Sequence, residues 1–174
     1  MKKLFMLLAV ALLILTGCTP SSTSGFTKEH VDKIVTAVKE AYGDDYGPSV
    51  LIEKEQLEEV YNINMENVEH FFAEGPMFTM STDMFIVLLA KDGKVAEVEA
   101  DMKAYQDYLI NESFQYPMNM PRVNASQVYV KGNIVAFVVL GKFDDRTEAT
   151  EEEYLEFAKE QIQIAIDTIE ETLK

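Results

Sequence analysis

The clearest hairpin pattern in the chain is Gln127-Val-Tyr-Val-Lys131, Gly132-Asn133, Ile134-Val-Ala-Phe-Val-Val-Leu140. Two runs rich in β-branched and aromatic residues flank a Gly-Asn pair, one of the two-residue turns that match the twist of paired strands. The stretch therefore predicts a β-hairpin with strands at 127–131 and 134–140. Upstream, Met84-Phe-Ile-Val-Leu-Leu-Ala90 is apolar throughout, which suits a central strand buried on both faces.

Helical spacing marks three longer segments around these strands. Apolar residues recur every three or four positions within 27–42, 95–109 and 150–173, and Thr27 and Thr150 are suitable N-caps. We therefore predict an α+β fold, in which a small antiparallel or mixed sheet with a C-terminal hairpin packs against two or three helices. The remaining expected elements are a brief helix at 53–61, an irregular strand at 68–80 and a loop at 114–122.

Composition limits the function. The chain has 174 residues, of which 48% are hydrophobic, with a formal net charge of −15 and a pI near 4.4. This length fits one domain with a single core. Nucleic acid is not expected as a partner, because phosphate contacts need clustered Lys and Arg that this chain lacks. One Cys excludes an internal disulfide framework and a Cys-rich zinc or iron–sulfur site.

The N-terminus has the features of a targeting signal. Lys2 and Lys3 precede an apolar run at 4–15, which as a helix covers about 18 Å, well short of a roughly 30 Å hydrocarbon core. The run ends in Leu15-Thr16-Gly17-Cys18, which resembles the lipobox of bacterial lipoproteins. The resemblance implies cleavage between Gly17 and Cys18, and a diacylglyceryl group on the Cys18 thiol. An ordinary secretory signal with a nearby Cys is the alternative.

These features divide the chain into four parts: a lipoprotein signal peptide at 1–17, a flexible Ser/Thr-rich tether at 18–26, an α+β domain at 27–142, and an acidic C-terminal helix within 143–174 that packs on or beside the domain. Without residues 1–17 the chain carries −17, because that segment holds two Lys and no acid. An anionic membrane surface repels such a domain, so the lipid must hold it. We expect a lipid-anchored protein on the extracytoplasmic face of the cell membrane, with an envelope protein as a possible partner.

Three short motifs resemble one known family when their order and spacing are considered. They are Tyr61-Asn62-Ile63, then Ala90-Lys91-Asp92-Gly93-Lys94 before a Val-Glu-Val-containing helix, then Val128-Tyr129-Val130-Lys131-Gly132-Asn133 before an apolar strand. The chain is similar here to the domain-of-unknown-function family DUF4358, over roughly residues 30–142. The resemblance implies a lipoprotein of a Firmicutes-type bacterium and supports the fold class, but it implies no activity. The acidic helix at 150–173 looks longer than the family usually shows.

Signatures of catalysis or metal binding are weak. His30 and His70 are the only imidazoles, and neither lies beside a nucleophile in a local motif. We expect His30 on the solvated side of the first helix and His70 as a partly covered structural residue. The adjacent acids Asp44-Asp45 and Asp144-Asp145 diverge too much to chelate one ion without loop curvature, and the EF-hand pattern is absent. No catalytic residue, metal site or cofactor is predicted, and the chain is not expected to be an enzyme.

One segment has the composition of a contact surface. Phe114-Gln-Tyr116-Pro-Met118-Asn-Met120-Pro121 combines aromatic, Met and Pro residues in a loop, and such a mixture makes an adaptable surface. Phe114, Tyr116, Met118 and Met120 are the candidate partner residues, but a loop packed over the core as a lid is the favoured interpretation of this segment.

Three function classes remain. The leading hypothesis is a membrane-anchored, non-enzymatic interaction module. A small-ligand or cation-binding lipoprotein is the second. A cell-wall hydrolase is the third. The thirty acids of the chain offer many carboxylate pairs for such an enzyme, but the chain has no Trp on which a sugar substrate could stack.

Overall fold

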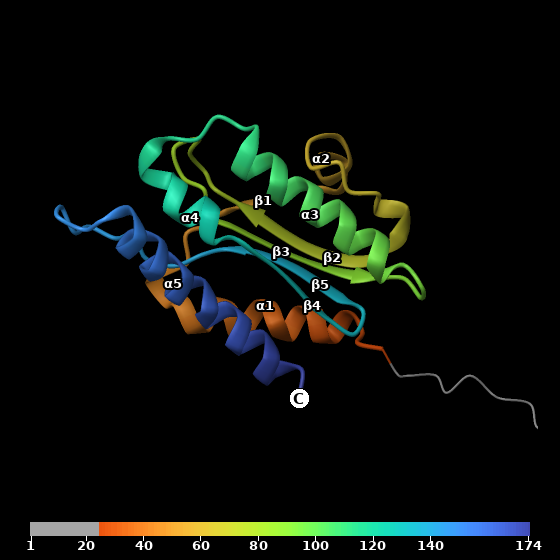
Figure 1. Ribbon diagram of the computed structural model, residues 1–174. Coiled ribbons are helices and arrows are strands. Elements are labelled where there is room, and N and C mark those ends of the chain that lie inside the picture. The colour runs from red at the N-terminus through yellow and green to blue at the C-terminus, as the bar shows by residue number, and fades with distance from the viewer. Residues whose placement is uncertain (1–24) are drawn as a thin grey trace, which may run out of the picture.

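The computed structural model describes residues 25–174, which form one five-stranded sheet with helices on both faces (Figure 1). The strand order is β1-β2-β3-β5-β4, and every neighbouring pair is antiparallel, so the predicted α+β class is confirmed in its antiparallel form. The strands are β1 (Val50–Leu51), β2 (Val68–Gly75), β3 (Met84–Ala90), β4 (Gln127–Lys131) and β5 (Ile134–Val139).

Two layers of helices cover the sheet. Helices α1 and α5 pack against one face, while α3 packs against the other, with α2 beside it (Figure 1). Short 3-10 turns at Gly43–Asp45, Met65–Asn67 and Pro117–Asn119 connect several of the elements. The helices are α1 (Lys28–Tyr42), α2 (Lys54–Glu59), α3 (Val95–Asn111), α4 (Met120–Ala125) and α5 (Glu151–Thr172).

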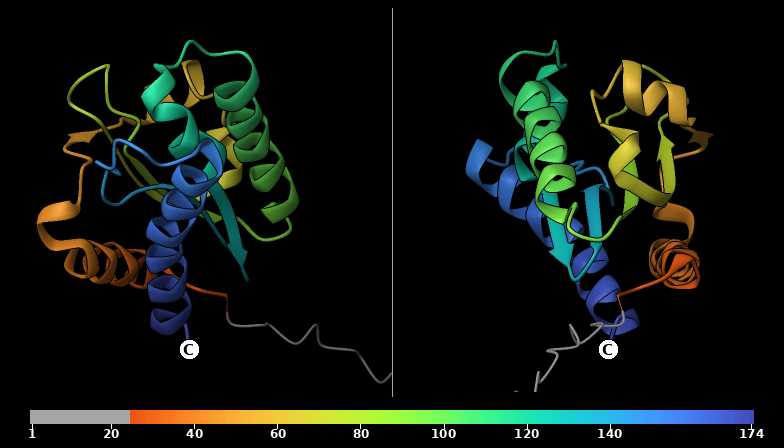
Figure 2. Two further views of the ribbon diagram at one scale, coloured as in Figure 1. Left: turned by 60° about the vertical axis from the view of Figure 1, so that its left-hand side comes forward. Right: turned by 90° about the vertical axis from the view of Figure 1, so that its right-hand side faces the viewer.

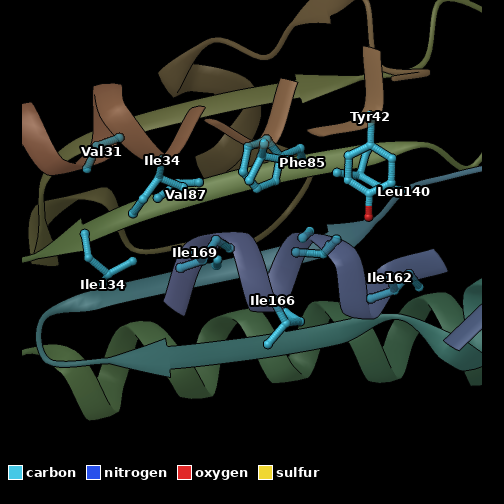
Figure 3. Packing of buried hydrophobic residues seen from close by; sticks show 14 of the residues in the cluster. Val31, Ile34, Tyr42, Phe85, Val87, Ile134, Leu140, Ile162, Ile166 and Ile169 are labelled. Atoms are coloured by element: carbon cyan, nitrogen blue, oxygen red, sulfur yellow. The ribbon is translucent and has the colours of Figure 1, made fainter. Parts of the chain in front are cut away.

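Strand β3 is buried on both faces, as its apolar sequence predicts. Because successive side chains of a strand point to opposite faces, Phe85 and Val87 enter the core beneath α1 and α5 (Figure 3). Ile86 and Leu88 enter the second core, beneath α3. All seven β3 residues are at most 7% exposed, so this strand joins the two halves of the hydrophobic core.

Helix α5 is part of the first core. Its residues Ile162 and Ile169 pack with Val31 and Ile34 of α1 over the sheet (Figure 3). The Tyr42 hydroxyl of α1 also donates a hydrogen bond to the Gln161 carbonyl oxygen of α5 over 2.6 Å. The acidic C-terminal helix therefore packs on the domain, with the apolar stripe that its spacing predicts.

Both predicted N-caps are present. The Glu153 backbone N–H donates to the Thr150 Oγ1 over 3.3 Å, and the Thr150 backbone N–H donates to the Glu153 carboxylate over 2.7 Å. At α1, the Thr27 backbone N–H donates to the Nδ1 of His30 over 3.1 Å. Each arrangement satisfies backbone donors that the first turn of a helix leaves free.

The β4–β5 hairpin has the predicted two-residue turn. Gly132 takes a φ of 58°, a region that glycine enters without steric strain. The Asn133 side chain accepts a hydrogen bond from the Phe26 N–H over 2.7 Å and donates to the Phe26 carbonyl over 2.9 Å. Phe26, the last residue of the sequence-predicted tether, is thus attached to the hairpin turn, and the chain enters the fold at this end of the sheet.

Three local expectations need correction. The strand expected at 68–80 ends at Gly75, because Pro76 lacks the N–H that would continue the ladder. The loop expected at 114–122 ends earlier, since α4 begins at Met120 and carries Pro121 in its first turn, where no N–H is needed. The two-residue strand β1 was not predicted from the sequence.

None of the helices within residues 25–174 combines the length and the hydropathy that a membrane crossing requires.

Candidate functional site

The sheet topology brings three loops to one end of the molecule. Met84 at the start of β3 pairs with Val139 at the end of β5, and Gln127 at the start of β4 pairs with Val138. The loops at 76–83, 112–119 and 141–149 therefore lie at the end of the sheet opposite the β4–β5 turn, where the chain enters (Figures 1 and 2). We call this the distal end.

Exposed apolar side chains concentrate on these loops. The three loops make up about one sixth of the described residues. They nevertheless carry seven of the twelve large hydrophobic side chains that are exposed within residues 25–174. Single exposed apolar side chains are normal, whereas a concentration of them on one part of a surface is typical of interaction sites. We call this set the distal surface; it consists of Met77, Phe78, Met80, Phe114, Tyr116, Met118 and Phe143.

Most of the predicted partner residues face solvent. Phe114 is 84% exposed and Met118 is 56% exposed, so these side chains do not pack over the core as the favoured lid interpretation requires. The ring of Tyr116 lies edge-on to that of Phe114, with centroids 5.6 Å apart. Met120, the first residue of α4, is partly buried. The contribution of Phe78 and its neighbours was missed, although Pro76-Met-Phe-Thr-Met80 has the same mixture of Pro, Met and aromatic residues.

A buried polar network fixes the distal loops. The guanidinium of Arg122 in α4 donates to both carboxylate oxygens of Asp83, one of them over 3.3 Å, and to the Gly141 carbonyl oxygen over 3.0 Å. Ser81 adds a hydroxyl donor to Asp83 over 2.6 Å, and Asn119 donates to the Met80 carbonyl oxygen over 2.8 Å.

The two charged partners are almost fully buried, at 8% exposure for Arg122 and 9% for Asp83. Gly141 has a φ of 104°, and a Cβ there would lie 2.6 Å from the Cβ of Gln161, so glycine is required at this crossing. The exposed apolar side chains therefore belong to loops with a fixed base.

A groove opens from the distal surface between α4 and α5. It has a volume of about 1100 Å³, and its third wall is the segment at 142–147. The Tyr154 hydroxyl donates to the Arg146 carbonyl oxygen, and the Lys142 N–H donates to the Gln161 side chain over 3.0 Å, so this segment is attached to α5. We call it the α4–α5 groove; its apolar lining includes Pro117, Met118, Met120, Pro121, Phe143, Leu155 and Phe157.

The charges around the groove are unevenly paired. Arg146 binds Asp144 through a guanidinium–carboxylate contact of 2.5 Å, and these hydrogen bonds hold the pKa of Asp144 below its usual range. Asp145, Glu151 and Glu152 are exposed and form no ion pair within residues 25–174. The groove therefore combines apolar walls with uncompensated negative charge.

Comparison with known proteins gives one result. A family model described as Domain of unknown function (DUF4358) matches residues 29–140, more than half of the chain. The chain belongs to the DUF4358 family. The match agrees with the span of roughly 30–142 that the short motifs indicate. No curated protein and no solved structure matches the chain.

The DUF4358 region includes all five strands and helices α1 to α4, apart from the first residue of α1, but α5 lies outside it. The loops at 76–83 and 112–119 are within the DUF4358 region, whereas Phe143 and the wall of the groove at 142–158 are not. The distal surface thus joins residues of the family domain to residues of the C-terminal segment.

Both histidines of the DUF4358 region have structural surroundings. His30 accepts the hydrogen bond that caps α1, and its ring lies edge-on to Phe26, with centroids 5.2 Å apart. His70 is partly covered, and its Nε2 lies 3.8 Å from a carboxylate oxygen of Asp32. His30 therefore has a capping role that the sequence analysis did not predict.

Within residues 25–174, no three His, Cys, Asp or Glu side chains are grouped closely enough to hold a metal ion. Asp45 lies 3.4 Å from Lys142, and Asp144 binds Arg146, so members of both acidic pairs contact cations. Gly17 and Cys18, the predicted cleavage and lipidation residues, lie outside the described residues.

Proposed function

We propose that this protein is a lipid-anchored, non-enzymatic docking module on the extracytoplasmic face of the cell membrane. Cys18 carries the lipid, and the distal surface binds an envelope protein. The observation that carries the proposal is the concentration of exposed apolar side chains, Phe78 and Phe114 among them, at the end of the sheet opposite Phe26.

The position of Phe26 supports a distal surface that faces away from the anchored end of the domain. Residues 18–25 can span at most about 27 Å when fully extended, and the seven residues of β3 alone span about 23 Å. The distal loops extend beyond the strands, so the domain is longer than β3 alone. If Cys18 is held in the membrane, the distal surface therefore touches that membrane only when the domain lies flat against it. A partner beside or above the domain is reached in the remaining orientations.

The fixed base of the loops supports docking as well. A loop whose base is held in place before binding loses less conformational entropy when a partner covers it. Aromatic and Met side chains such as Phe78 and Met118 are enriched at the cores of protein interfaces. The uncompensated acids near the groove also disfavour an anionic lipid surface as the binding target.

Site-specific photo-crosslinking in the producing bacterium tests the proposal. A benzophenone amino acid replaces Phe78 or Phe114 in the full chain, and matched controls carry it at Val60 or Ile164, which are exposed apolar positions outside the distal surface. We expect one envelope protein to be crosslinked from positions 78 and 114 but not from positions 60 and 164. The same crosslinks at all four positions, or none at any, would overturn the docking role.

A separate measurement tests the anchor. Cys18→Ala removes the thiol that receives the lipid, so the variant should leave the membrane fraction. The mass of the unaltered mature chain should in turn include a diacylglyceryl group on Cys18. An unmodified Cys18 in the processed protein would contradict the anchor without bearing on the distal surface.

A further inference from the structure

We infer that the α4–α5 groove binds an apolar peptide segment flanked by Lys or Arg side chains, supplied by the protein partner; the inference rests on the proposed docking function. It adds the chemistry of the ligand to the location of the surface.

The walls of the groove suit an apolar segment. Met118 and Met120 contribute flexible, polarizable side chains on one side, and Leu155 and Phe157 of α5 lie on the other. The volume of about 1100 Å³ slightly exceeds that of small-molecule sites, which are about 300–1,000 Å³ and enclose most of their ligand. Some side chains that line the groove, such as Phe143, are also exposed to solvent, so the groove is open and accessible to a peptide segment.

The charges specify which segment fits. Each cation that lines the groove already has a carboxylate partner: Arg122 binds Asp83, Arg146 binds Asp144, and Lys142 lies 3.4 Å from Asp45. Of the acids that line the groove, Asp145, Glu151 and Glu152 form no ion pair within residues 25–174.

A ligand that brings cations to these three carboxylates reduces their mutual repulsion, whereas an anionic ligand increases it. The net charge of −15 extends the same preference over the whole chain, because it steers cationic partners toward the protein. A Lys- or Arg-flanked apolar segment is thus complementary to both the walls and the rim of the groove.

The groove exists before a ligand binds. Arg122 holds α4 to the Gly141 carbonyl, and the Tyr154 hydroxyl holds α5 to the Arg146 carbonyl, so hydrogen bonds connect all three walls. Binding then requires little rearrangement of the protein, and affinity depends mainly on the fit of the segment.

Fluorescence anisotropy on the full chain in detergent tests the inference. Three labelled dodecapeptides serve as probes: one alternates Leu or Phe with Lys, the second has Glu in place of Lys, and the third keeps Lys but has Ser in place of the apolar residues. We expect only the first peptide to bind, and its affinity to fall as salt rises, because exposed charges are screened. Equal binding of the second or third peptide would overturn the inference.

Matched variants locate the site. Asp145→Asn, Glu151→Gln and Glu152→Gln together should weaken binding of the first peptide about tenfold, whereas Glu55→Gln, Glu59→Gln and Asp92→Asn, which change the net charge equally, should leave it within about twofold. Met118→Ser with Phe143→Ser should also weaken it, and Val60→Ser with Ile164→Ser should not. Circular dichroism checks that each variant is folded, and equal losses in both members of a matched pair would place the site elsewhere.

Two outcomes separate this inference from the docking function. If no peptide binds, yet positions 78 and 114 still crosslink to an envelope protein, the docking surface stands and the groove is not its peptide site. If the protein binds vesicles of anionic phospholipid in preference to the first peptide, the inference is wrong, because the ligand is then a lipid surface.

Discussion

Arg122→Met is the perturbation that most directly tests why the distal loops hold their shape. The substitution keeps most of the side-chain volume but removes the guanidinium that bonds the Asp83 carboxylate and the Gly141 carbonyl oxygen. Asp83 then retains the Ser81 hydroxyl as a donor but loses its counter-charge. Because both partners are more than nine-tenths buried, solvent cannot replace the lost interaction without opening the loops.

The expected effect is large. Removing one partner of a buried ion pair costs about 3–5 kcal/mol, because an uncompensated charge stays in a poorly solvated site. Domains of this size have about 5–15 kcal/mol of stability in total and lose about 2–4 °C of melting temperature per kcal/mol, so Arg122→Met should melt about 6–20 °C lower. Replacing both partners, as in Arg122→Met with Asp83→Leu, should cost much less than the two single substitutions together.

Urea denaturation followed by circular dichroism measures all four members of this double-mutant cycle. Hydrogen exchange of the amides at 76–83 and 117–125 reports whether the loss is local to the distal end. Single substitutions that each cost less than about 1 kcal/mol, or a double substitution whose cost equals their sum, would refute the claim that the pair fixes the loops.

Three further predictions use other parts of the fold. Ile162→Ala should cost about 2–5 kcal/mol in urea denaturation, because Ile162 is 1% exposed in the core beneath α1, while Ile164→Ala on the exposed side of the same helix should cost less than about 0.5 kcal/mol. Thr150→Ala should cost about 1 kcal/mol, because it removes the Oγ1 that accepts from the Glu153 N–H; Thr172→Ala near the other end of α5 is the control. Hydrogen bonds from Thr150 hold the pKa of Glu153 below its usual range, and hydrogen bonds from Arg146 do the same for the pKa of Asp144. The stability that these two carboxylates contribute is therefore present above the unfolded-state pKa values near 4, and it is lost as pH falls through the folded-state values. Urea midpoints measured downward from pH 6 should fall in acid less steeply for Arg146→Gln than for the unaltered chain, and parallel curves would contradict this assignment.

Local patterns predicted the parts of the fold that depend on neighbours in the chain. The hairpin at 127–140 was predicted because a Gly-Asn turn sets the register of its strands within a few residues. Strand β3 was predicted because a strand buried on both faces needs no polar position. Helix α4 was missed because Pro117 and Pro121 suggested a loop, although Pro121 lies in the first turn, where proline is tolerated.

The candidate site depended on contacts that no local pattern contains. Arg122 and Asp83 are 39 residues apart, and nothing in the spacing of either residue indicates the other. The groove likewise exists only because the 142–147 segment returns to α5 after the last strand. The exposure of Phe114 and Met118 was only one of two interpretations, because a mixture of aromatic, Met and Pro residues in one segment suits a lid over the core as well as a contact surface.

The boundary of the family match separates two contributions to the proposed site. The loops at 76–83 and 112–119 lie within residues 29–140, and Arg122 fixes them from within the same region. The three unpaired acids of the groove, Asp145, Glu151 and Glu152, all lie beyond residue 140. Helix α5 cannot be a loose appendage, because Ile162 and Ile169 fill the core that α1 and β3 leave open. Two of these acids, Glu151 and Glu152, lie in the first turn of a helix that the fold requires. Changes to these two acids therefore alter the preference for a cationic segment, while the buried stripe of the same helix preserves stability.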